Sequence, residues 1–150
     1  MKKPINEMRV SFPSRSANEG FARSVVASFL SQLDPAVDEL ADLRTAVSEA
    51  VTNCIVHAYR DEIGTITIHM KLYADGRTVV KVRDRGCGID NVNQAMEPLF
   101  TTGGDDRSGL GFSVMESFTD RLRVSSRLGR GTVVTMEKYI AVRHRQERAV

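Results

Sequence analysis

Two polar residues on a predicted helix have the types and spacing needed to hold a metal ion. Glu49 and Asn53 are four positions apart, so on a helix their side chains stand one above the other on a common face. A carboxylate and an amide oxygen placed in this way can hold a hydrated Mg²⁺ and orient a nucleophile. The same spacing is common on exposed helices, where it gives only a hydrogen-bonded pair. The pair alone therefore leaves both interpretations open.

Asp84 ends a predicted strand in which Val80 and Val82 share its face. The valines should face the core, so the carboxylate would lie at the edge of an apolar layer. There it needs a hydrogen-bond donor, such as the amino group of a bound base. Gly86 and Gly88 follow, and glycines allow a sharp turn and the close approach of a flat ligand. A simple turn after a strand explains the same segment equally well.

Two more segments could contact a ligand. Gly109, Leu110 and Gly111 open a predicted helix, where free N–H groups and the positive end of the helix dipole suit a phosphate. A glycine pair at a helix start is weak evidence by itself. Thr132 shares a strand face with Val134, so its hydroxyl could reach the same pocket as Asp84. Strand propensity alone also explains a threonine at this position.

Alternation of apolar and polar residues predicts the strands that carry these groups. A first strand covers residues 8–12 and stops at Pro13. One hairpin turns at residues 75–76, and a second, final hairpin turns at residues 129–131. Residues 85–108 form a long loop rich in glycine and polar residues, and loops of this length inside a compact domain are often functional.

Three helices are predicted between and after the strands. The first begins at a capping box over residues 16–19, and Phe21, Val25, Phe29 and Leu33 recur along one of its faces. Asp34 and Pro35 end that helix and open a second one that runs to about Tyr59. The core stripe of the second helix is predicted to be Leu40, Leu43, Val47, Ala50, Val51 and Ile55. A third helix follows residues 109–111, with Leu110, Val114 and Phe118 on one face.

These elements predict an α+β fold: a two-layer sandwich with a mainly antiparallel sheet covered by helices on one face. We expect a single domain over residues 1–150, with residues 1–6 and 141–150 as flexible ends. The net charge is only +2, which gives no support to broad electrostatic binding of nucleic acid. No segment is apolar enough to cross a membrane, and the N-terminus does not have the pattern of a secretory signal.

Cys54 and Cys87 are the two cysteines of the chain, and they lack metal-binding spacing. The expected location is therefore a reducing cytoplasm. Cys87 lies between two glycines but has no nearby His partner, so we interpret it as incidental rather than as a nucleophile.

The order and spacing of these segments resemble the GHKL superfamily of ATPases and kinases. Residues 49–53 (EAVTN) look like its N box, residues 84–88 (DRGCG) its first glycine box, residues 109–111 (GLG) its second and residues 131–132 (GT) its last. The resemblance implies ATP and Mg²⁺ as cofactors, with Asp84 bonded to the adenine amino group, Thr132 supporting that ring edge and Asn53 as the Mg²⁺ ligand. It also implies a lid over the phosphates between Asn91 and Ser108. The nucleotide-binding residues that it implies are Asn53, Asp84, Gly86, Gly88, Thr101, Thr102, Ser108, Gly109, Leu110, Gly111 and Thr132.

Within that superfamily the chain resembles the anti-sigma F factors of spore-forming bacteria, from Asn6 to about Lys138. Runs such as VSEAVTN at residues 47–53, PLFTT at residues 98–102 and RSGLGF at residues 107–112 carry the resemblance. It implies a homodimeric serine kinase that binds a sporulation sigma factor, sigma F, and phosphorylates an anti-anti-sigma factor protein on serine. It further implies no direct contact with nucleic acid or membrane.

The same resemblance implies roles for individual residues. Glu49 would be the base or orienting group for the acceptor serine, and Arg107 would contact the terminal phosphate. Arg23 and Thr52 would contact the protein partners. The chain departs from the family pattern in Ala58, where glycine is usual, and in a lid that is a residue short and richer in glycine.

Three alternatives remain open from the sequence. One is the related anti-sigma serine kinase of the general stress response, which differs only in its partner. Another is the catalytic module of a histidine kinase, although the first predicted helix contains no His. The third is a non-catalytic module that binds ATP and only sequesters a sigma factor.

Overall fold

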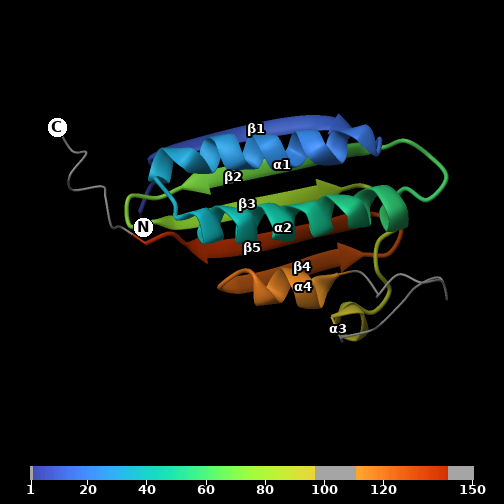
Figure 1. Ribbon diagram of the computed structural model, residues 1–150. Coiled ribbons are helices and arrows are strands. Elements are labelled where there is room, and N and C mark those ends of the chain that lie inside the picture. Colours follow the sequence, from blue (N-terminus) through green and yellow to red (C-terminus); the bar gives the residue numbers. More distant parts are fainter. Residues whose placement is uncertain (1, 97–110, 142–150) are drawn as a thin grey trace.

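The computed structural model describes residues 2–96 and 111–141. Within them, five strands form one antiparallel sheet in the order β1-β2-β3-β5-β4, and α1, α2 and α4 lie on one face of it (Figure 1). The strands are β1 (Asn6–Pro13), β2 (Thr65–Leu72), β3 (Arg77–Asp84), β4 (Arg121–Arg127) and β5 (Gly131–Tyr139). The helices are α1 (Ala17–Leu30), α2 (Val37–Asn53), α3 (Val92–Ala95) and α4 (Phe112–Ser117). The predicted two-layer α+β sandwich is confirmed.

Two hairpins make up four of the five strands. β2 and β3 form one, β4 and β5 form the other, and pairing of β3 with β5 joins them. β1 pairs with β2 and occupies one edge of the sheet. Because side chains alternate across a strand, the inner face of β2 is made of Ile66, Ile68, Met70 and Leu72, all fully buried. Among residues 2–96 and 111–141, no helix lies over the opposite face of the sheet (Figure 1).

α2 covers the middle of the sheet with an apolar stripe. Its buried residues are Leu43, Ala46, Val47, Ala50 and Val51. Leu40 and Ile55, which the sequence also assigned to the stripe, are partly buried against the same core. The predicted core side of this helix is therefore confirmed.

α1 faces the core mainly with residues other than those predicted, although the predicted Phe29 packs against the core and the predicted Leu33, just after the helix, is buried. Ala22, Val26 and Leu30 are its buried residues, one position after the predicted series. Phe21 is 46% exposed and packs edge-on against Phe12 of β1, with ring centroids 5.9 Å apart. The inner face of α1 is therefore made of Ala, Val and Leu, and Phe21 lies beside it against β1.

Both predicted helix caps are wrong. The Ser16 side chain makes no capping bond, because its backbone is helical rather than extended. The Glu19 carboxylate accepts a hydrogen bond from Ser48 and pairs with Arg23 Nε at 2.7 Å. Asp34 takes a left-handed conformation with φ of 51°, and α2 begins after Ala36. There the Ala36 N–H donates to the Glu39 carboxylate at 2.8 Å.

Two ends of elements also differ from the prediction. α2 stops at Asn53 and is followed by a π-helical turn, Cys54–Ala58, that reaches Tyr59. α4 buries Phe112 and Met115, and of the predicted face Phe118, just after the helix, is partly buried against the core. The structure also ties the N-terminal segment to the sheet, because β1 begins at Asn6 and the Ile5 N–H donates to the Leu72 carbonyl at 2.7 Å.

Candidate functional site

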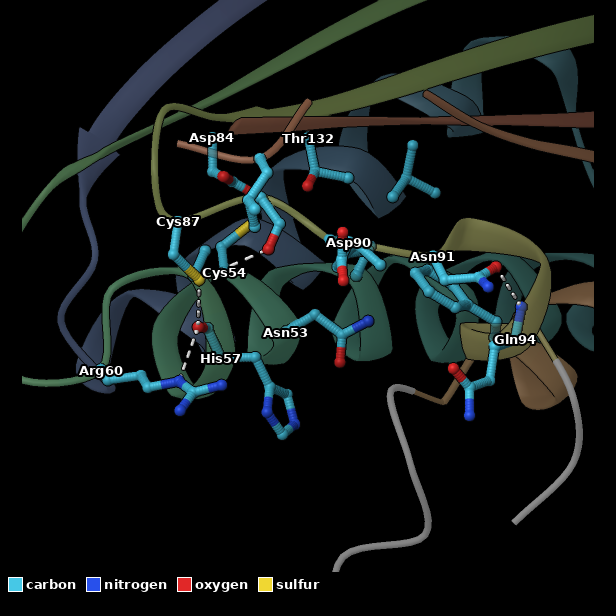
Figure 2. Close-up of a pocket in the computed structure, with 17 residues that line it drawn as sticks. Asn53, Cys54, His57, Arg60, Asp84, Cys87, Asp90, Asn91, Gln94 and Thr132 are labelled. Atoms are coloured by element: carbon cyan, nitrogen blue, oxygen red, sulfur yellow. Dashed lines mark hydrogen bonds between the residues drawn. The ribbon is translucent and has the colours of Figure 1, made fainter. Parts of the chain in front are cut away.

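A pocket of about 680 Å³ lies between the inner face of the sheet and the C-terminal end of α2 (Figure 2). Asp84 and Thr132 line it from the sheet, and Asn53 and His57 line it from the helix side. The volume is in the range found for small-molecule sites. Its apolar walls include Ile89 from the loop after β3.

Asp84 and Thr132 form the sheet side of the pocket. They are Cα partners in adjacent strands and are only 6% and 7% exposed. The prediction that strand alternation aims both side chains into one pocket is confirmed. The Thr132 hydroxyl lies 2.8 Å from the Ser126 hydroxyl of β4, so the end of the sheet presents a short polar row beside apolar walls.

The Asp84 carboxylate is only partly satisfied by the protein. One oxygen accepts the Gly86 N–H at 2.9 Å, and the other accepts the Cys54 thiol at 3.6 Å. Burial raises the pKa of this carboxyl above its ordinary value, and hydrogen bonds from the Gly86 N–H, the Cys54 thiol and the Thr132 N–H oppose that rise. A thiol is a weak donor, so Asp84 keeps capacity for a strong donor from a ligand.

The glycines after Asp84 are needed for close packing of the loop. A methyl group on Gly86 would collide with the Ala58 carbonyl, and Gly88, with φ of 76°, would collide with the Arg127 backbone. Gly88 lines the pocket, whereas Gly86 packs against the π-helical turn. The Cys87 N–H donates to the Ala58 carbonyl at 3.1 Å, which fastens the loop to the end of that turn.

The π-helical turn adds pocket residues that sequence reasoning missed. Cys54 and His57 project from it, and Cys87 faces them from the loop (Figure 2). Burial raises the pKa of the Cys54 thiol well above its ordinary value, whereas Cys87 is exposed at the surface. No sequence signal marks a π turn here, since the hydrophobic pattern of α2 continues through it as though it were α-helical.

Tyr59 fixes the chain after this turn. Its hydroxyl donates to the Thr65 carbonyl at 2.8 Å and accepts the Arg85 N–H at 2.6 Å. One side chain thus joins the end of the π turn, the start of β2 and the loop after β3.

Glu49 and Asn53 lie in neighbouring hollows. Asn53 lines the main pocket, while Glu49 lines a smaller hollow of about 300 Å³ together with Arg23, Arg44 and Ser48. The Glu49 carboxylate lies against Gly111, which has φ of 69° and stands at the start of α4. The structure thus brings the predicted Glu49, Gly111 and Arg23 to one side of α2. Thr52 is half-buried and lines neither hollow.

Several predicted residues fall outside the described part of the chain. They are Thr101, Thr102, Arg107, Ser108, Gly109 and Leu110, together with most of the predicted lid. Across residues 2–96 and 111–141, no group of three or more His, Cys, Asp or Glu side chains could hold a metal ion. The same part of the chain contains no helix with the length and apolarity needed to span a membrane.

Comparison with known proteins identifies this architecture. The family described as histidine kinase-like ATPase domain matches residues 12–138. Among solved structures, the RsbU and RsbW domains of a Mycobacterium tuberculosis protein superpose with a TM-score of 0.68 at 20% identity, over 91% of this chain and 32% of that one. The catalytic domain of the histidine kinase ThkA gives 0.58 at 16% identity, over 89% and 96%. At these identities the two structures show a shared fold.

Curated relatives are much more similar in sequence. The anti-sigma F factor of Caldanaerobacter subterraneus subsp. tengcongensis is 54% identical over 136 residues, covering 90% of this chain and 94% of the relative. The anti-sigma F factor of Priestia megaterium is 47% identical over 137 residues, covering 90% and 93%. The chain therefore belongs to the histidine kinase-like ATPase domain family and, within it, to the anti-sigma F factors.

Proposed function

We propose that this protein is an ATP-dependent serine kinase that binds the sporulation sigma factor sigma F and phosphorylates its anti-anti-sigma factor. The observation that carries the proposal is the buried Asp84–Thr132 pair at the end of a pocket whose other side carries Asn53. Similarity to anti-sigma F factors at 47–54% identity supports the choice of partner. The protein would act in the cytoplasm as a homodimer.

Asp84 and Thr132 would select the base. A carboxylate at an apolar wall accepts a hydrogen bond from the exocyclic amino group of adenine, and the Thr132 hydroxyl borders the same ring edge. The apolar walls, such as Ile89 and Val134, suit a flat aromatic ring. Because one of the donors to Asp84 is a thiol, which is a weak donor, a base that brings an amino group improves the hydrogen bonding of this carboxylate.

The residues present fit a Mg²⁺–nucleotide complex. Mg²⁺ keeps several waters and takes few protein ligands beside the phosphates, so the amide oxygen of Asn53 at the pocket can serve as its protein ligand. When bound, Mg²⁺ offsets the charge of the phosphates during transfer. The Gly111 N–H, with those of Gly109 and Leu110, and the side chains of Thr101, Thr102 and Ser108 would hold the phosphates.

Glu49 would orient or deprotonate the acceptor serine. It lies one helical turn before Asn53, and its hollow is separate from the base pocket, as required for a group that meets a second substrate. Arg23 lines the same hollow, so it can contact an approaching protein partner, with Thr52 nearby on the same helix. Arg107 would contact the terminal phosphate.

The test is transfer of radiolabelled phosphate from ATP to a purified anti-anti-sigma factor. We expect acid-stable label on serine with the wild-type protein, and at least about a hundredfold slower transfer with Glu49→Gln at unchanged ATP affinity. Glu116→Gln is the matched control, because it makes the same chemical change on an exposed residue of α4. Full transfer by Glu49→Gln would remove Glu49 from the reaction.

Two alternatives predict different results in the same assay. A non-catalytic module would bind ATP and sigma F but transfer no label. A general-stress kinase would bind ATP but leave the sporulation substrate unlabelled and act on another one. Binding of sigma F, followed by size-exclusion chromatography with and without ATP, separates these two cases.

A further inference from the structure

The open face of the sheet carries a cationic row across its strands. Residues paired from strand to strand run Arg9 in β1, His69 in β2, Lys81 in β3, Thr135 in β5 and Arg123 in β4. Alternation along each strand aims these side chains away from the helices. Neighbouring strands are about 4.8 Å apart, so the row covers about 19 Å. The net charge of the whole chain is only +2, so this local concentration of positive charge is not apparent from the composition.

The row beside it adds hydroxyls and one more cation. Two positions along the strands, the paired residues are Ser11, Thr67, Arg83, Val133 and Ser125. On the other side, the paired residues are Glu7, Lys71, Val79, Glu137 and Arg121, whose charges balance. The face therefore has a cationic band two rows wide, bordered by a neutral row.

The band is poorly compensated within the protein. Lys81, Arg83 and Arg123 are exposed, and among the described residues no carboxylate lies within ion-pair distance of them. Of the two acids in the neutral row, Glu7 pairs with a member of the band, His69, and Glu137 pairs outside the band. Glu7 pairs with His69 Nε2 at 2.9 Å, and Glu137 pairs with Arg77 at 2.8 Å. Lys81, Arg83 and Arg123 therefore remain available to an anionic partner.

We propose that this band docks an acidic helix of a protein partner, lying across the strands. A helix rises about 5.4 Å per turn, so carboxylates one turn apart advance in steps close to the spacing of the strands. Its diameter of about 10–12 Å covers the two cationic rows and leaves the row of Glu7 and Glu137 free. The Arg side chains can bind carboxylates through two parallel hydrogen bonds.

Other occupants fit less well. A DNA duplex, whose major groove alone is about 12 Å wide, would also overlie Glu7 and Glu137. The two cationic rows contain no Phe, Tyr or Trp on which the bases of a single strand could stack. A second copy of the chain using the same face would oppose one cationic row with another.

The site is also separate from the pocket of Asp84 and Thr132, which opens on the helix side, so it does not depend on the proposed kinase activity.

The experiment measures binding of a fluorescein-labelled helical peptide of about 20 residues with glutamates at every fourth position along one face. A peptide with glutamines at those positions is the matched probe, and a DNA duplex of similar length is the third. The test variant is Lys81→Gln with Arg123→Gln. The control variant, Lys3→Gln with Arg15→Gln, removes the same charge from exposed residues outside the band.

We expect the wild type and the control variant to bind the glutamate peptide, with an affinity that falls as salt is raised. The test variant should bind it about tenfold more weakly, and its melting temperature should stay close to that of the wild type, because both changes are at exposed positions without an ion-pair partner. Equal affinity of the two variants, or equal binding of the glutamine peptide, would overturn the proposal. Tighter binding of the duplex than of the glutamate peptide would also overturn it, in favour of a nucleic-acid surface.

Discussion

Asp84 and Thr132 stand directly opposite each other in β3 and β5, at the place where the two hairpins of the sheet meet. Each is buried at the end of an apolar strand face, and each has a polar partner from a third element, Cys54 for the acid and Ser126 for the hydroxyl. The pocket therefore has its polar end where four elements converge: β3, β4, β5 and the π-helical turn.

Asp84→Asn should weaken ATP binding about 10- to 100-fold, because a charged acceptor of the adenine amino group becomes a neutral one. Isothermal titration calorimetry measures the change. Asp90→Asn is the matched control, since Asp90 lines the same pocket at its exposed rim and should change affinity little. An unchanged affinity in Asp84→Asn would show that this carboxylate does not contact the base.

The same variant should show a pH-dependent gain in stability without ligand. Burial raises the pKa of the Asp84 carboxyl in the folded state above 3.8, so the folded protein binds this proton more tightly than the unfolded chain does. The free energy of unfolding contributed by Asp84 is then highest below 3.8 and falls as the pH rises through the raised pKa. Asp84→Asn lacks this loss, so its melting temperature relative to the wild type should increase between about pH 4 and pH 7. A difference independent of pH would mean that the buried charge costs nothing.

Gly111→Ala should lower the rate of phosphate transfer by more than the backbone strain of alanine at this position explains. Gly111 and Gly129 both have left-handed φ angles, 69° and 79°, so alanine costs roughly 1 kcal/mol of strain at either position. Only at Gly111 would the methyl group also strike the Glu49 carboxylate, since nothing lies within 4 Å at Gly129. Gly129→Ala should keep phosphate transfer, and Gly111→Ala should lose at least about tenfold. Equal activity of the two variants would show that Glu49 tolerates displacement.

Cys87 should react with iodoacetamide faster than Cys54. Cys87 is exposed at the pocket, whereas burial raises the pKa of the Cys54 thiol and keeps it protonated. Mass spectrometry of peptides after brief alkylation would give the two rates, and bound nucleotide should protect Cys87. Cys87→Ser supplies the background. Faster labelling of Cys54 would mean that the wall of the pocket opens readily.

Tyr59→Phe should lower the free energy of unfolding by about 1–3 kcal/mol, because the Arg85 N–H and the Thr65 carbonyl both lose their partner. For a chain of this length the melting temperature should fall by roughly 2–8 °C. Tyr139→Phe removes the same group from a residue that is 52% exposed, and should be nearly neutral. Similar losses in both variants would contradict the role of the Tyr59 hydroxyl.

The direction of side chains on the strands was predictable from the sequence. Side chains alternate with a period of two, so a polar residue two positions from a buried apolar residue points to the same face. Val80 and Val82 fixed the direction of Asp84, and Val134 fixed that of Thr132. The face of α1 was not predictable in this way, since Phe21 and Ala22 are both apolar and only packing on Phe12 decides between them. The local sequence around Glu19 predicted a capping role. In the structure its carboxylate instead contacts Ser48, from α2, and Arg23, one turn further along α1.

Two further features could not be predicted from the sequence, for similar physical reasons. Cys54 and His57 line the pocket because the chain forms a π-helical turn after α2. Helix propensities do not distinguish such a turn from the α-helix that precedes it. The cationic band depends on the register between strands that are distant in sequence, so neither composition nor net charge could reveal it.

Joining of the two hairpins by β3 and β5 has a consequence for the order of folding. The β2–β3 and β4–β5 hairpins each turn within a few residues and can form from local contacts, whereas the pairing of β3 with β5 must close a long segment of chain. The polar end of the pocket exists only after that closure. A ligand at this end of the pocket therefore binds only after β3 and β5 have paired. It should slow unfolding, in which the two hairpins separate, without speeding the formation of either hairpin.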